Sequence, residues 1–200
     1  MSNANWVEKA IVNNFVWAFI QRRHVIPVWK SSMELGRDAT VLEIGCGRGA
    51  GAVYLYDAFS PACIHAFDID DRMVRKARRF AGRDYEGRIR FYVADAANIP
   101  AGDGTYDAVF DFFTLHHVDD WKKSLSEISR ILKPGGYFAF GELYGSAVKS
   151  YDLRNLLHLP VGERFDRPRL VRALAENRLR LMERKNTLWG RGMIAVAGRS

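Results

Sequence analysis

A carboxylate beside a glycine-rich turn is the feature of this sequence that most clearly suggests chemistry. Glu43 lies two residues before Gly45, in the segment Glu43-Ile44-Gly45-Cys46-Gly47-Arg48-Gly49-Ala50. Glycines after a strand let a ligand approach the backbone closely and accept positive φ angles. The spacing Gly45-x-Gly47-x-x-Ala50 also satisfies a dinucleotide-binding fingerprint. Because the Glu43 carboxylate would repel a pyrophosphate, the turn favours a cationic ligand over a dinucleotide.

Two further acidic residues end expected strands. Asp68 closes the run Cys63–Asp68, about 20 residues beyond the glycines, where a carboxylate accepts hydrogen bonds from ribose hydroxyls. Asp70 is predicted to cap the following helix instead. Asp95 follows the expected strand Arg90–Ala94 and can accept a hydrogen bond from an exocyclic amine. Its alternative role is that of an ordinary turn residue.

The elements that position these residues alternate along the chain. Apolar runs predict strands at Thr40–Ile44, Cys63–Asp68, Arg90–Ala94, Tyr106–Phe112, Tyr137–Leu143, Leu179–Leu188 and Gly192–Gly198. Helices are expected within residues 3–30, with an end or kink at Pro27, at Gly49–Phe59, from Asp70 or Asp71 to Ala81, from Asp119 or Asp120, and at Arg167–Asn177. Lys133-Pro134-Gly135-Gly136 is predicted as a helix stop and turn.

This alternation predicts an α/β fold. Its doubly wound, mostly parallel, seven-stranded sheet would have helices on both faces and an antiparallel C-terminal hairpin. The last two strands must be antiparallel because a short turn joins them. In such a sheet ligands bind beyond the carboxyl ends of the strands, which is where Glu43, Asp68 and Asp95 are expected.

The segment Val41–Gly49 resembles the first motif of the class I S-adenosylmethionine-dependent methyltransferases, a strand that ends acidic-x-Gly-x-Gly-x-Gly. The resemblance covers residues 38–143 strongly, including Ile131–Tyr137, and the final hairpin loosely. It implies a Rossmann-like fold, S-adenosylmethionine as cofactor and S-adenosylhomocysteine as product. It also implies that Ile69 lies against the adenine ring and that Asp95 binds the adenine amino group. The implied cofactor-binding residues are Glu43, Gly45, Cys46, Gly47, Gly49, Asp68, Ile69, Met73, Asp95, Ala96 and Asp111.

No residue is identified as catalytic from the sequence, and the candidates are Asp111, His116 and Glu142. Asp111 departs from the small or amide residue that the resemblance leads us to expect. A titrating histidine of the pair His116 and His117 could remove a proton from the methyl acceptor, although packing is the alternative for each. Glu142 and Tyr144 are candidate polar groups on the acceptor side. The two cysteines lack zinc-ligand spacing, and no metal site is expected.

The variable segments are expected to choose the acceptor. Residues 1–36 are predicted to form an aromatic-rich helical lid, and residues 37–200 the methyltransferase domain, with a variable substrate-side insertion at 145–166. The predicted activity is methyl transfer to a small-molecule acceptor of apolar or aromatic character. Alternatives are a membrane-associated methyltransferase acting on a phospholipid or quinone, an NAD-dependent oxidoreductase, and a non-catalytic cofactor-binding module.

Composition narrows the partners and the compartment. The formal net charge is +7, and residues 72–90 carry eight basic and two acidic side chains, so peripheral contact with an anionic membrane is an open alternative. Nucleic acid is disfavoured, because arginine-rich helices alone do not make a binding footprint. Two cysteines and the lack of a secretory pattern at the start favour a reducing cytoplasm. The oligomeric state is not predicted.

Overall fold

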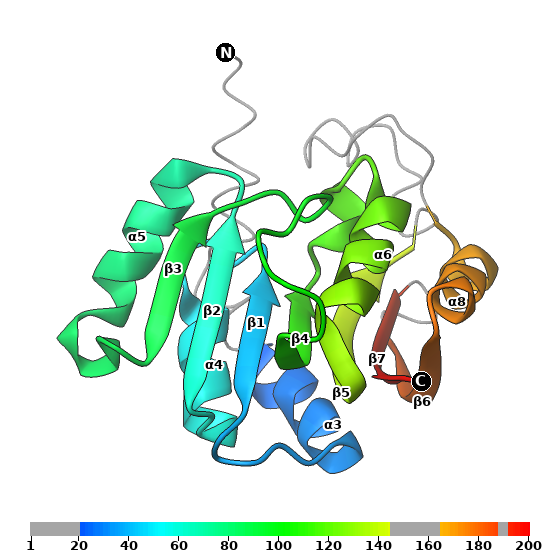
Figure 1. Ribbon diagram of the computed structural model, residues 1–200, viewed down its shortest axis with the longest axis horizontal. Helices are drawn as coiled ribbons and strands as arrows, with labels where there is room; N and C mark the ends of the chain where they lie inside the picture. The colour runs from blue at the N-terminus through cyan, green and yellow to red at the C-terminus, as the bar shows by residue number, and fades with distance from the viewer. Residues whose placement is uncertain (1–20, 145–164, 188–191) are drawn as a thin grey trace.

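The computed structural model describes residues 21–144, 165–187 and 192–200, and its centre is one seven-stranded sheet (Figure 1). The strand order is β3-β2-β1-β4-β5-β7-β6. Strands β1 to β5 pair in parallel, and β7 runs antiparallel to both β5 and β6. The strands are β1 (Thr40–Ile44), β2 (Cys63–Asp68), β3 (Ile89–Val93), β4 (Tyr106–Phe112), β5 (Leu132–Leu143), β6 (Leu179–Thr187) and β7 (Gly192–Arg199). The predicted fold class is confirmed.

Helices cover both faces of the sheet. One face carries α3 (Ile26–Ser32), α4 (Ala50–Phe59) and α5 (Asp71–Ala81), and the other carries α6 (Trp121–Ile131) and α8 (Arg167–Glu176). Three short turns of helix, η1 (Gln21–Val25), η2 (Arg83–Tyr85) and η3 (Leu115–His117), complete the described elements. Each face has its own apolar core, so the sheet is the wall between two clusters of buried side chains.

Local sequence signals explain where these elements begin. Helix α5 starts after Asp70, whose side chain accepts a hydrogen bond from the Arg72 backbone N–H at 2.9 Å. Helix α6 starts after Asp120, which accepts from the Lys123 N–H at 3.1 Å. In β1, four consecutive buried residues from Val41 to Ile44 mark a strand that is covered on both faces. The central strand thus delivers its carboxyl end, and Glu43, into the interior.

Two predicted strand starts were wrong. Strand β5 begins at Leu132, because Leu132 pairs with Tyr106 before a register shift, and the segment expected as a free turn lies inside the strand. Strand β3 spans Ile89–Val93, one residue earlier than expected, since the buried Ile89 pairs with Ile64. Near Pro27 one helical element ends and another begins: the π-helical turn η1 stops at Val25, and Pro27 lies in the first turn of α3, where its missing N–H costs nothing.

The described part of the predicted N-terminal lid packs on the sheet. Trp29 of α3 is fully buried, and its ring centroid lies 5.5 Å from that of Phe110 and 4.6 Å from that of Phe112. Residues 1–20 of that segment, and 145–164 of the predicted substrate-side insertion, lie outside the described residues, so both roles stay predictions. None of the helices in the described ranges has the length and apolar character needed to span a bilayer.

Candidate functional site

The turn after β1 is built from glycines in the left-handed region. Gly45, Gly47 and Gly49 have φ angles of 65°, 51° and 87°. A Cβ on Gly49 would lie 2.9 Å from the Cβ of Ala77, and one on Gly45 would collide with the Thr114 side chain. Backbone conformation and lack of space therefore both require glycine, and the turn presents backbone rather than side chains to a ligand.

Glu43 lies beneath this turn as a buried carboxylate, with only 2% of its surface exposed. A hydrogen bond from the Ala52 backbone N–H engages it at the start of α4, and a Cβ on Gly51 would collide with its Oε1 atom. Its Oε2 atom is buried and has no hydrogen-bond partner among the described residues. Burial first, then the charges of Asp68 and Asp111, raise the pKa of Glu43 well above its usual value. A cation bound beside Oε2 would compensate this buried acceptor.

Asp68 connects the end of β2 to the same turn. Its Oδ2 atom accepts a hydrogen bond from the Gly47 N–H at 2.9 Å, and its Oδ1 atom accepts from the Asp70 N–H at 2.9 Å. An ionised carboxylate has about four acceptor sites, and hydroxyl groups such as those of a ribose are suitable donors to it. Next to it, Ile69 is 73% exposed, so its side chain is accessible to a flat aromatic ligand.

The remaining predicted cofactor residues fall into two groups. Asp95 is exposed two residues beyond β3, and its Oδ1 atom accepts from the Ala97 N–H at 2.9 Å, as in a turn. Cys46, Met73 and Ala96 are buried, with at most 7% of each residue exposed. Burial also raises the pKa of the Cys46 thiol. Any cofactor contact of these three residues remains a prediction.

A second cluster joins the ends of β4 and β5. Asp111 and Glu142 are both fully buried there. Glu142 Oε1 accepts from the Leu115 N–H at 2.7 Å, and Glu142 Oε2 lies 2.6 Å from His116 Nδ1. Burial raises the pKa of Glu142 to about 7. Burial and the neighbouring Glu142 charge also raise the pKa of Asp111 well above its usual value.

This arrangement fixes the orientation of His116. When Glu142 is ionised, His116 Nδ1 carries the hydrogen that Glu142 accepts, and Nε2 is left as the basic atom. The His116 side chain retains 11% exposure, whereas Glu142 has none. The His117 ring packs 4.1 Å from the His116 ring, centroid to centroid. Any role of His116 in proton transfer remains a prediction.

Sequence reasoning missed Thr114, which joins the two clusters. Its N–H donates to Asp111 Oδ1 at 2.8 Å, and its hydroxyl donates to the Ile44 carbonyl at 3.3 Å. Phe113, just before it, adopts a φ of 62°, which non-glycine residues rarely do. The turn after β4 is thus held against the end of β1. The only sequence signal was the Asp-x-x-Thr spacing, which is too common to be specific.

The site as a whole suits a positively charged ligand. Glu43, Asp68, Asp111 and Glu142 lie at the carboxyl ends of the adjacent strands β1, β2, β4 and β5. Negative charges this close raise one another's pKa, and a cation among them would relieve the repulsion. The orphaned Glu43 oxygen, the glycine turn and the exposed Ile69 therefore fit S-adenosylmethionine, which combines a cationic end with an adenosine.

Comparison with known proteins also finds similarity to methyltransferases. The model of the family described as "Methyltransferase domain" matches residues 42–140. The fatty-acid O-methyltransferase of Mycolicibacterium smegmatis is 32% identical over 145 residues, which cover 72% of this chain and 45% of that protein. The phthiotriol/phenolphthiotriol dimycocerosates methyltransferase of Mycobacterium tuberculosis is 34% identical over 106 residues, covering 52% of this chain and 37% of that one. The chain therefore spans less than half the length of these two relatives.

Solved structures share the fold at low identity. A methyltransferase described in complex with the Haloferax volcanii Trm112 activator superposes with a TM-score of 0.78 at 20% identity, covering 96% of this chain and 97% of that one. Geranyl diphosphate C-methyltransferase from Streptomyces coelicolor, solved with S-adenosyl-L-homocysteine, gives a TM-score of 0.76 at 18% identity, covering 91% and 77% of the two chains. At these identities the likeness concerns the fold alone.

Proposed function

Since the chain belongs to the class I S-adenosylmethionine-dependent methyltransferase family, we propose that it transfers the methyl group of S-adenosylmethionine to a small apolar or aromatic molecule. The observation that carries this proposal is the buried, unsatisfied Oε2 of Glu43 beneath three left-handed glycines. The name of the Mycolicibacterium smegmatis relative, a fatty-acid O-methyltransferase, supports an apolar acceptor.

Each side chain of the first cluster has a place in cofactor binding. When bound, S-adenosylmethionine supplies a methyl group that its sulfonium already activates. Glu43 would face the cationic methionine end, and Asp68 would accept from the ribose hydroxyls. Ile69 would cover one face of the adenine, and Asp95 would accept from the adenine amino group. The protein's main contribution is then positioning, which can supply roughly 7–11 kcal/mol of a barrier.

The second cluster would handle the proton of the acceptor. His116 Nε2 would take the proton from an acceptor hydroxyl and so make its oxygen a better nucleophile. Glu142 would hold Nδ1–H and stabilise the imidazolium that forms, since its Oε2 atom lies 2.6 Å from Nδ1. Asp111 would keep its proton and hydrogen-bond to Glu142, which prevents two buried carboxylates from both being ionised.

Ligand-dependent melting tests the proposal directly. S-adenosylhomocysteine at 100 times its Kd should add about 2.7 kcal/mol to the free energy of unfolding, by mass action. NAD at the same concentration should leave the melting temperature unchanged, since Glu43 repels its pyrophosphate. A shift with NAD and none with S-adenosylhomocysteine would indicate an oxidoreductase. Binding without methyl transfer from labelled cofactor to a panel of fatty acids, long-chain alcohols and phenols would indicate a non-catalytic module.

Proton release on cofactor binding gives a second test. In the free protein burial raises the pKa of Glu43, whereas an adjacent cation would lower that pKa again. Between these two pKa values the free protein holds a proton that the complex gives up, so affinity for S-adenosylmethionine should rise with pH across this window and level off above it. Calorimetry over a series of pH values in buffers of different ionisation enthalpy should show this release. Glu43→Gln should abolish it, and release that is unchanged in this variant would contradict the assignment.

For the compartment, we propose the reducing cytoplasm, in which Cys46 and Cys63 stay thiols. A peripheral membrane contact is the alternative that the exposed basic face of α5, including Lys76 and Arg79, leaves open. Co-sedimentation with anionic vesicles at low salt distinguishes the two, because a protein without such a contact stays in the supernatant.

A further inference from the structure

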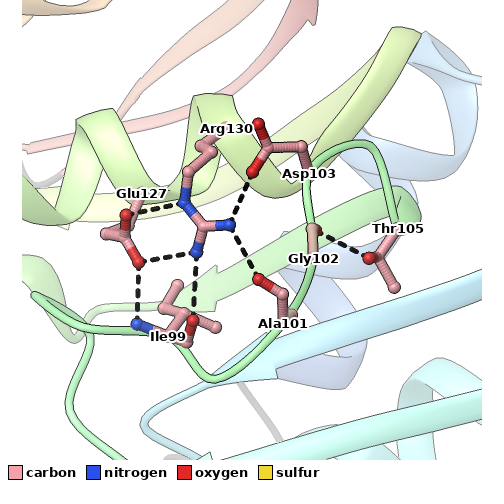
Figure 2. A network of polar contacts seen from close by, with 7 residues as sticks. All are labelled: Ile99, Ala101, Gly102, Asp103, Thr105, Glu127 and Arg130. Atoms are coloured by element: carbon pink, nitrogen blue, oxygen red, sulfur yellow. Dashed lines mark hydrogen bonds and ion pairs between the residues drawn. The ribbon is translucent and has the colours of Figure 1, made fainter.

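An ion pair on α6 lies outside the candidate site but binds the loop between β3 and β4, which contains Asp95 (Figure 2). Glu127 and Arg130 are three residues apart on the helix. The Arg130 guanidinium donates to both oxygens of Glu127, from Nε to Oε1 at 2.8 Å and from Nη2 to Oε2 at 2.8 Å. This bidentate geometry fixes the plane of the guanidinium, and the hydrogen bonds from Arg130 lower the pKa of Glu127, which keeps the carboxylate ionised.

The pair holds the loop between β3 and β4 through its backbone. Arg130 Nη2 donates to the Ile99 carbonyl at 3.0 Å, and Arg130 Nη1 donates to the Ala101 carbonyl at 2.7 Å. Glu127 Oε2 accepts from the Ile99 N–H at 2.9 Å, so both polar backbone groups of Ile99 are bound by this one pair. A further ion pair runs from Nη1 to Asp103 Oδ1 at 2.9 Å. Figure 2 shows these contacts converging on the guanidinium from the loop on one side.

Ile99, which the ion pair holds, follows directly after the turn that contains Asp95. The Asn98 N–H donates to the Asp95 carbonyl at 3.0 Å, and the Ala97 N–H donates to the Asp95 carboxylate at 2.9 Å. Asn98 is followed directly by Ile99, whose side chain is anchored in the core with 3% exposure. The position of the Asp95 carboxylate therefore depends on a short turn. The turn begins just after β3 and ends at Ile99, which is hydrogen-bonded to α6.

We propose that Glu127 and Arg130 are positioning residues for adenine selectivity, because they hold the 95–105 loop so that Asp95 faces the exocyclic amino group of the cofactor. The inference rests on the proposed function, since it needs an adenosyl cofactor in the site. Neither residue would touch the cofactor. The hydrogen bond that Asp95 makes is directional, so a small shift of the turn weakens it without unfolding the protein. Lysine cannot replace Arg130, because an ammonium cannot bind two carbonyls and a carboxylate in one plane.

The test compares two ligands that differ at the adenine amino group. S-adenosylhomocysteine carries the amino group, and S-inosylhomocysteine carries a 6-oxo group that the Asp95 carboxylate repels. Wild-type protein should bind the adenosyl ligand about 10- to 100-fold more tightly, the range expected for a hydrogen bond to a charged group. Asp95→Asn should remove this preference, because its amide can donate to the 6-oxo group, and it sets the limit for complete loss.

If the hydrogen bonds from Glu127 and Arg130 to the loop are what orients Asp95, Arg130→Lys and Glu127→Gln should reduce the preference for the adenosyl ligand. The reduction should be at least about fivefold, toward the value of Asp95→Asn. Lys133→Gln is the matched control: it removes the nearby ion pair between Lys133 Nζ and Asp107 Oδ1, 2.7 Å apart, which does not touch the loop. Glu127→Gln keeps the Arg130 bonds to the carbonyls of Ile99 and Ala101, so it tests selectivity even if Arg130→Lys does not fold.

The outcomes distinguish the positioning role of Glu127 and Arg130 from the proposed function itself. If the wild-type protein binds the adenosyl ligand and the preference is unchanged in both Arg130→Lys and Glu127→Gln, the inference is wrong and the proposed function is unaffected. Weaker binding of both ligands by the same factor also overturns it, because that is what a merely structural role predicts. Failure of the wild-type protein to bind either ligand removes the proposed function and the inference with it.

Discussion

Replacing His116 by alanine should lower kcat for a hydroxyl acceptor by about 10²–10⁴-fold and leave the Kd for S-adenosylhomocysteine within about threefold. The reason is geometric: Glu142 Oε2 lies 2.6 Å from His116 Nδ1, so the ring is oriented with Nε2 as the atom that would take the acceptor's proton. A fatty-acid carboxylate needs no base, so the same variant should methylate such an acceptor at close to the wild-type rate.

His117→Ala is the matched control for this prediction. Its ring packs 4.1 Å from that of His116, and Glu142 is bonded to His116, so kcat should fall by less than about tenfold. Steady-state rates with a labelled methyl group, together with calorimetric Kd values, distinguish the two histidines. Equal losses in both variants, or a full rate in His116→Ala with a hydroxyl acceptor, would refute the assignment of His116 as the base.

The pH profile gives the same mechanism an independent readout. Glu142 must be ionised to accept Nδ1–H, and burial raises its pKa to about 7. Because a raised carboxyl pKa means that the proton is held at lower pH, kcat/KM for a hydroxyl acceptor should rise as pH increases through about 7. Glu142→Gln removes this titration, so its profile should lose that limb and its rate should fall by up to about 10⁴-fold, as expected when a base loses its orienting carboxylate. A limb near pH 7 that persists in Glu142→Gln would assign the titration elsewhere.

Local pattern was enough to predict most of the elements that build the site. Strand β1 and its turn were predictable from Val41–Ile44 and the glycines that follow. A strand covered on both faces and a left-handed turn each accept only a small set of residue types. The cap at Asp70 was equally readable. The segment Lys133–Gly136 was not, since whether it forms a free turn or a bulged strand depends on Tyr106, a partner 26 residues away from Leu132.

The chemistry of the second cluster could not be read from the sequence for the same reason. Asp111 and Glu142 lie 31 positions apart, and only the pairing of β4 with β5 brings them together. Their pKa values depend on burial, which a residue type does not reveal. Likewise, Glu127 and Arg130 read as an ordinary surface pair on a helix until their contacts with Ile99 and Ala101 are seen.

Replacing Asp68 by asparagine should raise the Kd for S-adenosylhomocysteine by about 100-fold, since hydrogen bonds to a charged group contribute about 1.5–3 kcal/mol each. In the wild-type protein both Asp68 oxygens accept, one from the Gly47 N–H and one from the Asp70 N–H, each at 2.9 Å. An asparagine has only one acceptor oxygen, so it must give up one of these anchors and weaken the bonds to the ribose hydroxyls. The glycine turn would lose its tie to β2 at the same time.

Asp70→Asn isolates the ribose contribution, because the two aspartates are neighbours with different partners. Asp70 caps α5 through its bond to the Arg72 N–H, and asparagine caps a helix about as well, so the free energy of unfolding should change by less than about 1 kcal/mol. Its backbone N–H still donates to Asp68, so the Kd should stay within about twofold of wild type, well below the cost of losing one charged hydrogen bond. Calorimetry on the two variants decides between them: a large loss of affinity in Asp70→Asn with little change in Asp68→Asn would move the ribose from the end of β2 to the helix cap.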